Sequence, residues 1–84
     1  MSYEVQIKPS AVKELKNLQE ADRGRIVDRI QALAQDPRPR GYEKLTGGSR
    51  YRVRQGSHRV LYEVDDEAQI VTVVKIGHRR DVYR

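Results

Sequence analysis

The 84-residue chain contains no cysteine and only two histidines, His58 and His78. Without cysteine, the protein can form neither a disulfide bond nor a metal site with thiolate ligands. Two isolated histidines are too few for a typical zinc site. We therefore expect no bound metal, and no sequence pattern indicates a cofactor.

Long apolar segments are also missing. No stretch approaches the roughly 18 apolar residues that form a membrane-spanning helix, and the N-terminus lacks the apolar region of a secretory signal peptide. Hydrophobic residues make up 37% of the chain and charged residues 35%, which is typical of a globular protein rather than a disordered one. We expect one small domain over residues 1–84, located in the cytoplasm and without a membrane partner.

Acidic residues are outnumbered by basic ones. The chain has 17 lysines and arginines against 12 aspartates and glutamates, so its formal net charge is +5. This excess favours a polyanion or an acidic protein as the partner. Many basic domains bind neither, so the charge alone does not identify a function.

The positive charge is concentrated in residues 50–59, which contain four arginines, one histidine and no acidic residue. Side chains on a strand point alternately to opposite faces of the sheet. The segment therefore predicts a basic face and an apolar face, formed by Arg50, Arg52 and Arg54 and by Tyr51 and Val53, respectively. A turn at residues 55–57 would return the chain so that Arg59 lies beside the basic face.

The first half of the chain predicts a strand and two helices. Apolar and polar side chains alternate in residues 3–7, which predicts a short, half-buried strand. Pro9 and Ser10 predict a helix start, because proline is tolerated in the first helical turn and serine is a good N-cap. Apolar residues at helical spacing predict a second helix over about residues 21–35, so that the two helices form a hairpin.

The second half predicts a loop followed by a small sheet. Residues 36–49 are rich in proline and glycine and are expected to be irregular. Strands are predicted at residues 50–55, 58–65 and 69–77, joined by tight turns so that neighbours pair antiparallel. The last of these is apolar on both faces, which is typical of a central strand. A strand, a helical hairpin and a three-stranded antiparallel meander predict an α+β fold with the helices on one face.

Two interpretations of the arginines stay open. In a meander, Arg52, Arg54, Arg59 and Arg79 can converge on one open face, where guanidinium groups could bind phosphate. A change of register by one residue would reverse that face. Alternatively, basic side chains on an exposed sheet face are simply solvated.

The tyrosines and histidines differ in their surroundings. Tyr51 and Tyr62 lie among apolar residues and are expected in the core, whereas Tyr83 is nearly terminal and flanked by charge. His78 precedes two arginines and is a candidate for proton transfer, because histidine titrates near neutral pH. His58 lies at a predicted turn, which is more typical of a surface histidine.

Three segments in a fixed order carry a family resemblance. They are Tyr51-Arg52-Val53-Arg54, then Ser57-His58-Arg59-Val60-Leu61-Tyr62-Glu63-Val64, and then Gly77-His78-Arg79-Arg80 followed by Tyr83. This pattern resembles the RelE/ParE superfamily of toxins from type II toxin–antitoxin systems, and the RelE-type mRNA interferases most of all. The resemblance covers nearly the whole chain, and it implies the microbial-RNase-like fold of RelE.

RelE-type toxins are ribosome-dependent mRNA endonucleases, so the resemblance implies cleavage of codons in the ribosomal A site, inhibition of translation and growth arrest. It also implies where the catalytic residues lie: Arg52, Arg54, Arg59, Arg79 and Tyr83. Arg50, Arg80 and His58 would contribute to RNA binding.

The implied reaction needs no metal. The ribose 2′-OH attacks the adjacent phosphate, which leaves a 2′,3′-cyclic phosphate and a 5′-OH. A base must accept the proton of the 2′-OH, cations must stabilise the phosphorane, and an acid must protonate the leaving oxygen.

The roles that this reaction assigns are only partly determined. Better-characterised relatives carry lysines where Arg52 and Arg54 stand, and arginine is effectively never deprotonated. The base would therefore be Tyr83 or His78, although Tyr83 could instead stack on a base of the codon. Arg79 would stabilise or protonate the leaving oxygen.

The resemblance also implies partners and an alternative function. Toxins of this class have a cognate antitoxin protein, with which a heterotetramer is common. The chain could instead be a ParE-like toxin that poisons DNA gyrase by contact and hydrolyses nothing, or a basic module that only binds RNA or antitoxin. ParE-like members generally lack the full set of arginines and tyrosine, which favours the nuclease.

Overall fold

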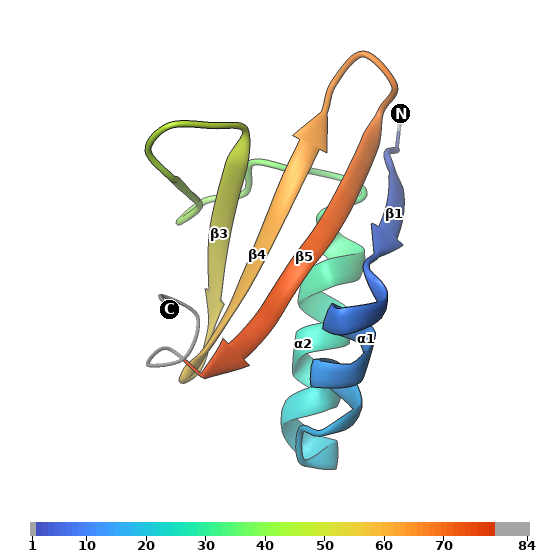
Figure 1. Ribbon diagram of the computed structural model, residues 1–84, viewed down its shortest axis with the longest axis vertical. Helices are drawn as coiled ribbons and strands as arrows, with labels where there is room; N and C mark the ends of the chain where they lie inside the picture. The colour runs from blue at the N-terminus through green and yellow to red at the C-terminus, as the bar shows by residue number, and fades with distance from the viewer. Residues whose placement is uncertain (1, 79–84) are drawn as a thin grey trace.

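The computed structural model describes residues 2–78 and contains one sheet and two helices (Figure 1). The elements, in chain order, are β1 (Glu4–Ile7), α1 (Pro9–Lys16), α2 (Glu20–Ala32), β2 (Glu43–Lys44), β3 (Arg50–Gln55), β4 (His58–Asp65) and β5 (Ile70–His78). Neither helix is long and apolar enough to cross a membrane, within the described part of the chain.

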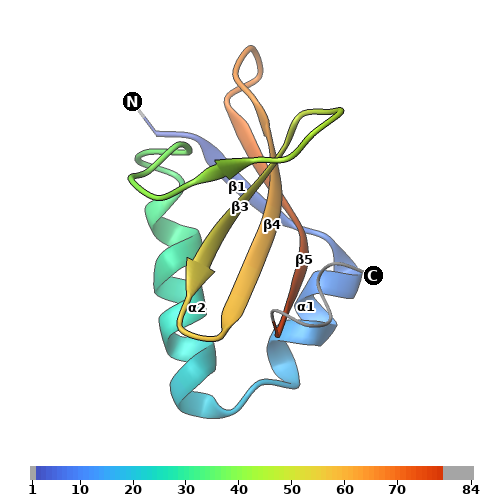
Figure 2. The same ribbon diagram turned by 90° about the vertical axis from the view of Figure 1, so that its left-hand side faces the viewer.

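The sheet has five strands in the order β1-β5-β4-β3-β2. Strands β2 to β5 form an antiparallel meander, whereas β1 pairs parallel to β5. Both helices lie on the same side of the sheet (Figure 2). The predicted α+β fold, with its strand, helical hairpin and meander, is confirmed. The prediction that the last strand is the central one is wrong, because β4 occupies the middle and β5 lies beside it.

The core lies between the helices and one face of the sheet. Fully buried Ala11 and Ile26 from the helices pack against apolar sheet residues. These sheet residues are Tyr51, Val53, Val60, Tyr62, Val64, Val71, Val73 and Ile76. In β3 and β4 these residues alternate with residues on the opposite face. In β5 a register shift opposite Leu61 and Tyr62 places Val73 and Ile76, three residues apart, on the same core face. The prediction that Tyr51 and Tyr62 are core residues is confirmed, since their exposed fractions are 7% and 0%.

The helix ends differ from the sequence prediction in detail. Pro9 occupies the first turn of α1 as expected, but the N-cap is Lys8 in extended conformation, so Ser10 lies inside the helix. Helix α2 ends at Ala32, three residues before the predicted end. The chain continues there in tight turns, and the carbonyl of Ala34 accepts a hydrogen bond from the backbone N–H of Tyr3 (2.7 Å). After α2 ends, a backbone hydrogen bond to the N-terminal segment therefore replaces the helical hydrogen bonds.

The loop that follows α2 is held to the sheet by side chains. The buried Tyr62 hydroxyl donates a hydrogen bond to the carbonyl of Pro37 (2.6 Å). The guanidinium of Arg38 donates to Asp66 (2.7 Å) and to the Tyr51 hydroxyl (3.2 Å), and it also lies over the Tyr51 ring. Asp66 accepts a further hydrogen bond from Tyr3 (2.7 Å). These contacts join the loop, the β4–β5 turn and the N-terminal segment.

Strand β2 lies in the segment that was predicted to be irregular, so that prediction is wrong for Glu43 and Lys44. These two residues pair with Arg52 and Tyr51 of β3 and form the edge of the sheet. Tyr42, just before β2, packs its ring against Tyr51 at a centroid distance of 5.9 Å. A two-residue strand is too short to show periodicity, and only its pairing with β3 defines it.

We predict that Tyr62→Phe lowers the free energy of unfolding by about 1–2 kcal/mol, because the buried Pro37 carbonyl loses its hydrogen-bond donor. Urea denaturation followed by circular dichroism measures the change. Tyr42→Phe is the matched control, because the side chain of Tyr42 is 40% exposed. Equal stability of Tyr62→Phe and the wild-type protein would show that this hydrogen bond does not hold the loop.

A second prediction concerns acid stability. Hydrogen bonds from Arg38 and Tyr3 lower the pKa of Asp66 to about 2. A lowered folded-state pKa adds stability above the ordinary value near 4, and this contribution disappears as the pH falls from about 4 to about 2. Asp66→Asn should therefore be less stable than wild type at neutral pH and should lose less stability in that acid range. Thermal melts at several pH values test this, with Glu67→Gln as the control for one lost negative charge.

Candidate phosphate-binding site

The register between β3 and β4 brings arginines together on the sheet face away from the helices. Arg54 lies directly opposite Arg59, and Arg52 lies opposite Leu61. Since Tyr51 and Val53 point into the core, Arg52 and Arg54 point to the other face, as their alternation predicts. The predicted proximity of Arg59 to this row is thus confirmed.

This face is less open than the sequence suggested. Arg52 and Arg59 are only 7% and 8% exposed, whereas the side chain of Arg54 is 59% exposed. The expectation of an open, solvated row is therefore wrong for Arg52 and Arg59. Leu61 and Val74 lie on the same face and form a small apolar cluster with Leu45. Apolar neighbours thus reduce the contact of the arginines with water.

One carboxylate joins two of these arginines. Glu43 Oε2 accepts a hydrogen bond from Arg52 Nη2 at 2.6 Å, and Glu43 Oε1 lies 3.4 Å from Arg54 Nε. The hydrogen bond from Arg52 is the main cause of a lowered pKa at Glu43, and the charges of Arg52, Arg54 and Arg59 act in the same direction. Glu43 is therefore an anion held between Arg52 and Arg54 from the edge of the sheet.

Arg50 is also ion-paired, at the far end of the row. Its Nε donates to Glu63 Oε2 at 3.1 Å, and the two residues are cross-strand partners in β3 and β4. Both side chains are well exposed, so the pair contributes little to stability. Although residues 50–59 contain no acid, neighbouring strands thus supply carboxylates to each arginine of the β3 row.

The two histidines meet at the end of the sheet beside the arginines. His58 and His78 are cross-strand partners, and their rings lie nearly perpendicular with centroids 6.0 Å apart. Val60 and Ile76, two residues away on each strand, are core residues, so alternation directs both imidazoles to the helix side of the sheet, opposite the face of Arg59. The two imidazoles come together although they are far apart in sequence.

Comparison with known proteins identifies the family. The family model described as the ParE toxin of the type II toxin–antitoxin system parDE matches residues 5–83. The chain belongs to this toxin family. RelE1 of Methanocaldococcus jannaschii, which is named as a toxin, is 31% identical to it over 100% of this chain and 98% of RelE1. A shorter match, 41% identical over 34 residues, joins 40% of this chain to 39% of the toxin RelG of Mycobacterium tuberculosis.

Solved structures share the fold of this toxin. The RelE–RelB complex from Pyrococcus horikoshii contains a chain that is 31% identical, with a TM-score of 0.85 over 96% of the toxin and 99% of that chain. The toxin–antitoxin complex RelBE2 from Mycobacterium tuberculosis contains one that is 26% identical, with a TM-score of 0.84 over 94% and 100% of the two chains. The fold and the family resemblance expected from the sequence are therefore confirmed.

Three site residues expected from the sequence, Arg79, Arg80 and Tyr83, lie outside the described residues 2–78 of the toxin. Their roles stay predictions. Glu43, in contrast, contacts the arginine group and was not foreseen. No sequence signal marked it, because residues 42–45 (Tyr-Glu-Lys-Leu) do not alternate between apolar and polar, and only the pairing of β2 with β3 brings Glu43 to Arg52.

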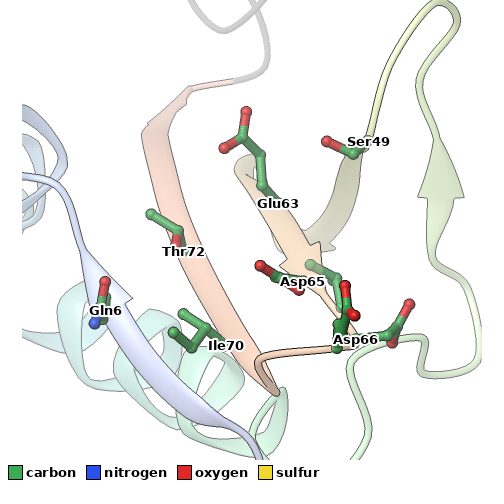
Figure 3. A pocket seen from close by; sticks show the side chains of 9 residues that line it. Gln6, Ser49, Glu63, Asp65, Asp66, Ile70 and Thr72 are labelled. Atoms are coloured by element: carbon green, nitrogen blue, oxygen red, sulfur yellow. The ribbon is translucent and has the colours of Figure 1, made fainter.

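Figure 3 shows an acidic hollow beside the turn between β4 and β5. The strand pairing places it at the opposite end of the sheet from His58 and His78. It has a volume of about 600 Å³, and four carboxylates line it, from Glu63, Asp65, Asp66 and Glu67. Figure 3 shows Gln6 of β1 and Thr72 of β5 on its other side. Negative charge repels phosphate, so this hollow does not suit RNA. Within residues 2–78, no group of three or more histidine, aspartate or glutamate side chains could hold a metal ion.

We predict that the arginines of this site differ in their effect on stability. Arg52→Ala should lower the free energy of unfolding by about 1–3 kcal/mol, because it removes a buried side chain that pairs with Glu43. Arg54→Ala should change it by no more than about 0.5 kcal/mol, because that side chain is largely exposed. Urea denaturation of both variants measures this difference. Equal effects would show that Arg52 is not part of the packed face.

Proposed function

We propose that this toxin is an endoribonuclease that cleaves mRNA in the ribosomal A site and thereby inhibits translation in the cytoplasm. The observation that supports this most is the cross-strand register that places Arg52, Arg54 and Arg59 on one sheet face. Planar guanidinium groups bind phosphate oxygens in a bidentate manner. The net charge of +5 favours association with RNA, and the similarity to proteins named RelE supports the same function.

In the proposed reaction the 2′-oxygen forms a bond to phosphorus and the bond from phosphorus to the 5′-oxygen breaks. The products are a 2′,3′-cyclic phosphate and a free 5′-OH. Arg52, Arg54 and Arg59 would bind the phosphate and stabilise the charge that develops on its oxygens. Two partly dehydrated cations on an apolar floor suit this role, because charge interactions strengthen where water is excluded.

Proton transfer falls to residues near the end of β5. Arginine does not give up its proton, so the base would be Tyr83 or His78. His78 follows Gly77, the partner of Arg59, but alternation directs its side chain to the opposite face of the sheet, which favours Tyr83 as the base. Arg79 would stabilise or protonate the leaving 5′-oxygen, and no metal or other cofactor takes part. Arg50, Arg80 and His58 would bind flanking RNA.

We also propose a cognate antitoxin as the protein partner, in a heterotetramer. Two of the similar solved structures are complexes of a toxin with an antitoxin. On this toxin, a groove of about 470 Å³ along α1 is lined by Pro9, Ser10, Val12, Lys13 and Lys16. Its mainly apolar floor and flanking lysines suit an acidic, amphipathic segment.

A second function is supported by the matching family model, which describes ParE toxins. In that case the toxin would poison DNA gyrase by direct contact and would not cleave RNA. A basic module that binds only RNA or antitoxin is the remaining possibility. The three functions differ in whether translated mRNA is cut and whether gyrase is blocked.

We predict that induced wild-type toxin cuts a translated reporter mRNA at codon-phased positions, which primer extension detects. Tyr83→Phe and Arg54→Ala should each lower cleavage by about 100-fold or more, a typical effect of removing one group that stabilises the transition state. Arg25→Ala on α2 is the matched control, since it removes an exposed arginine from the helical side.

A gyrase supercoiling assay on the same extracts distinguishes the alternatives. Intact mRNA together with blocked gyrase would assign the toxin to the ParE type. Intact mRNA together with active gyrase would leave a binding module. Normal cleavage by Arg54→Ala would contradict the proposed site even if the toxin is a nuclease.

A further inference from the structure

The arginine pair proposed to bind phosphate already holds an anion. The two carboxylate oxygens of Glu43 are divided between two arginines: Oε2 lies 2.6 Å from Arg52 and Oε1 lies 3.4 Å from Arg54. A phosphodiester would bind in the same way, because its two non-bridging oxygens lie on one central atom and can each contact a different guanidinium. The carboxylate of Glu43 is therefore a chemical stand-in for phosphate.

Glu43 and a phosphate cannot use these donors at the same time. Arg52 is only 7% exposed, and its Nη2 is engaged by Glu43. A phosphate that remained outside would meet the negative charge of Glu43 first. RNA must therefore move the carboxylate away before it can contact Arg52.

The position of Glu43 in the sheet allows this movement. It belongs to β2, which has two residues and pairs only with β3 at the edge of the sheet. Gly41 and Gly47, on either side of β2, both have positive φ angles, of 90° and 83°. Glycine permits changes of backbone conformation that other residues resist. Moving β2 thus disrupts few backbone hydrogen bonds and leaves the apolar core in place.

We propose that Glu43 is an autoinhibitory contact, which occupies the phosphate position between Arg52 and Arg54 until RNA displaces it. This inference rests on the proposed function, because it takes RNA as the source of the phosphate. Glu43 reduces the affinity of the free toxin for phosphate, because its carboxylate engages Nη2 of Arg52 in the absence of RNA. Removal of the Glu43 carboxylate should therefore strengthen phosphate binding. If Glu43 instead positioned Arg52 for binding, its removal would weaken phosphate binding.

The test compares Glu43→Gln with Glu67→Gln. Both variants remove one negative charge, but Glu67 lies in the β4–β5 turn, beside the acidic hollow. The glutamine oxygen can still accept a hydrogen bond from Arg52, which favours folding of Glu43→Gln. Glu43→Asp keeps the charge on a shorter side chain and should bind with intermediate affinity. Circular dichroism verifies that each variant is folded.

Two probes report on binding without cleavage. Inorganic phosphate is titrated while the Nε–H signals of the arginines are followed by NMR. A short, fluorescein-labelled 2′-O-methyl RNA, which lacks the attacking hydroxyl, is titrated by fluorescence anisotropy. At about 50 mM salt, Glu43→Gln should bind both probes about 5- to 10-fold more tightly than wild type. Glu67→Gln should change either affinity by less than about 2-fold, and the gain should shrink at about 1 M salt.

Each outcome leads to a decision. If Glu43→Gln binds phosphate no more tightly than wild type, or if Glu67→Gln gains as much, the autoinhibitory contact is refuted. If wild type binds the RNA and Glu43→Gln binds it equally or less well, the proposal is also refuted. If Glu43→Gln gains affinity for phosphate while neither protein binds RNA, Glu43 does occupy an anion site and its displacement by RNA is refuted, whereas primer extension decides the proposed cleavage separately.

Discussion

The two-residue turn between β3 and β4 determines where the core and the candidate site form. Gly56, with a φ angle of 61°, and Ser57 close the hairpin so that Gln55 pairs with His58. Every later pair follows from that one: Arg54 meets Arg59 on one face, and Tyr51 meets Tyr62 on the other. A shift by one residue would direct arginines toward the helices and tyrosines toward water. Packing of the core therefore enforces the grouping of the cations.

The buried arginine of the site needs a counter-charge, and the edge strand β2 supplies it. A charged side chain that leaves water needs a counter-charge or hydrogen-bond partners. Glu43 supplies a carboxylate to Arg52 from β2, much as Asp66 supplies one to Arg38 in the loop after α2. The difference lies in their surroundings: Asp66 links three segments of the fold, whereas Glu43 sits on a short edge strand. The pair of Arg38 and Asp66 therefore suits a structural role, whereas the pair of Arg52 and Glu43 suits exchange of the carboxylate for another anion.

Sequence periodicity was enough to predict most of the fold. Alternation in β3 and helical spacing in α2 depend on neighbouring residues, so strand faces and element types could be read from the chain. The family pattern added the arginine group around Arg59. Neither source could show that Arg52 is buried or that Glu43 reaches it, because both facts depend on pairing between β2 and β3. The parallel placement of β1 was missed for the same reason: its partner lies more than sixty residues away.

The pairing of β1 with β5 also affects when the protein can fold. Glu4 lies beside Ile70 and Ile7 beside Val73, so β1 pairs with the strand that is made last among the described elements. Contacts between distant segments form only after the intervening chain is available. A nascent chain has its helices and the β3–β4 hairpin before it has a complete sheet. Completion of the sheet is thereby postponed until β5 has been made, and a polypeptide that lacks β5 leaves β1 without its partner strand.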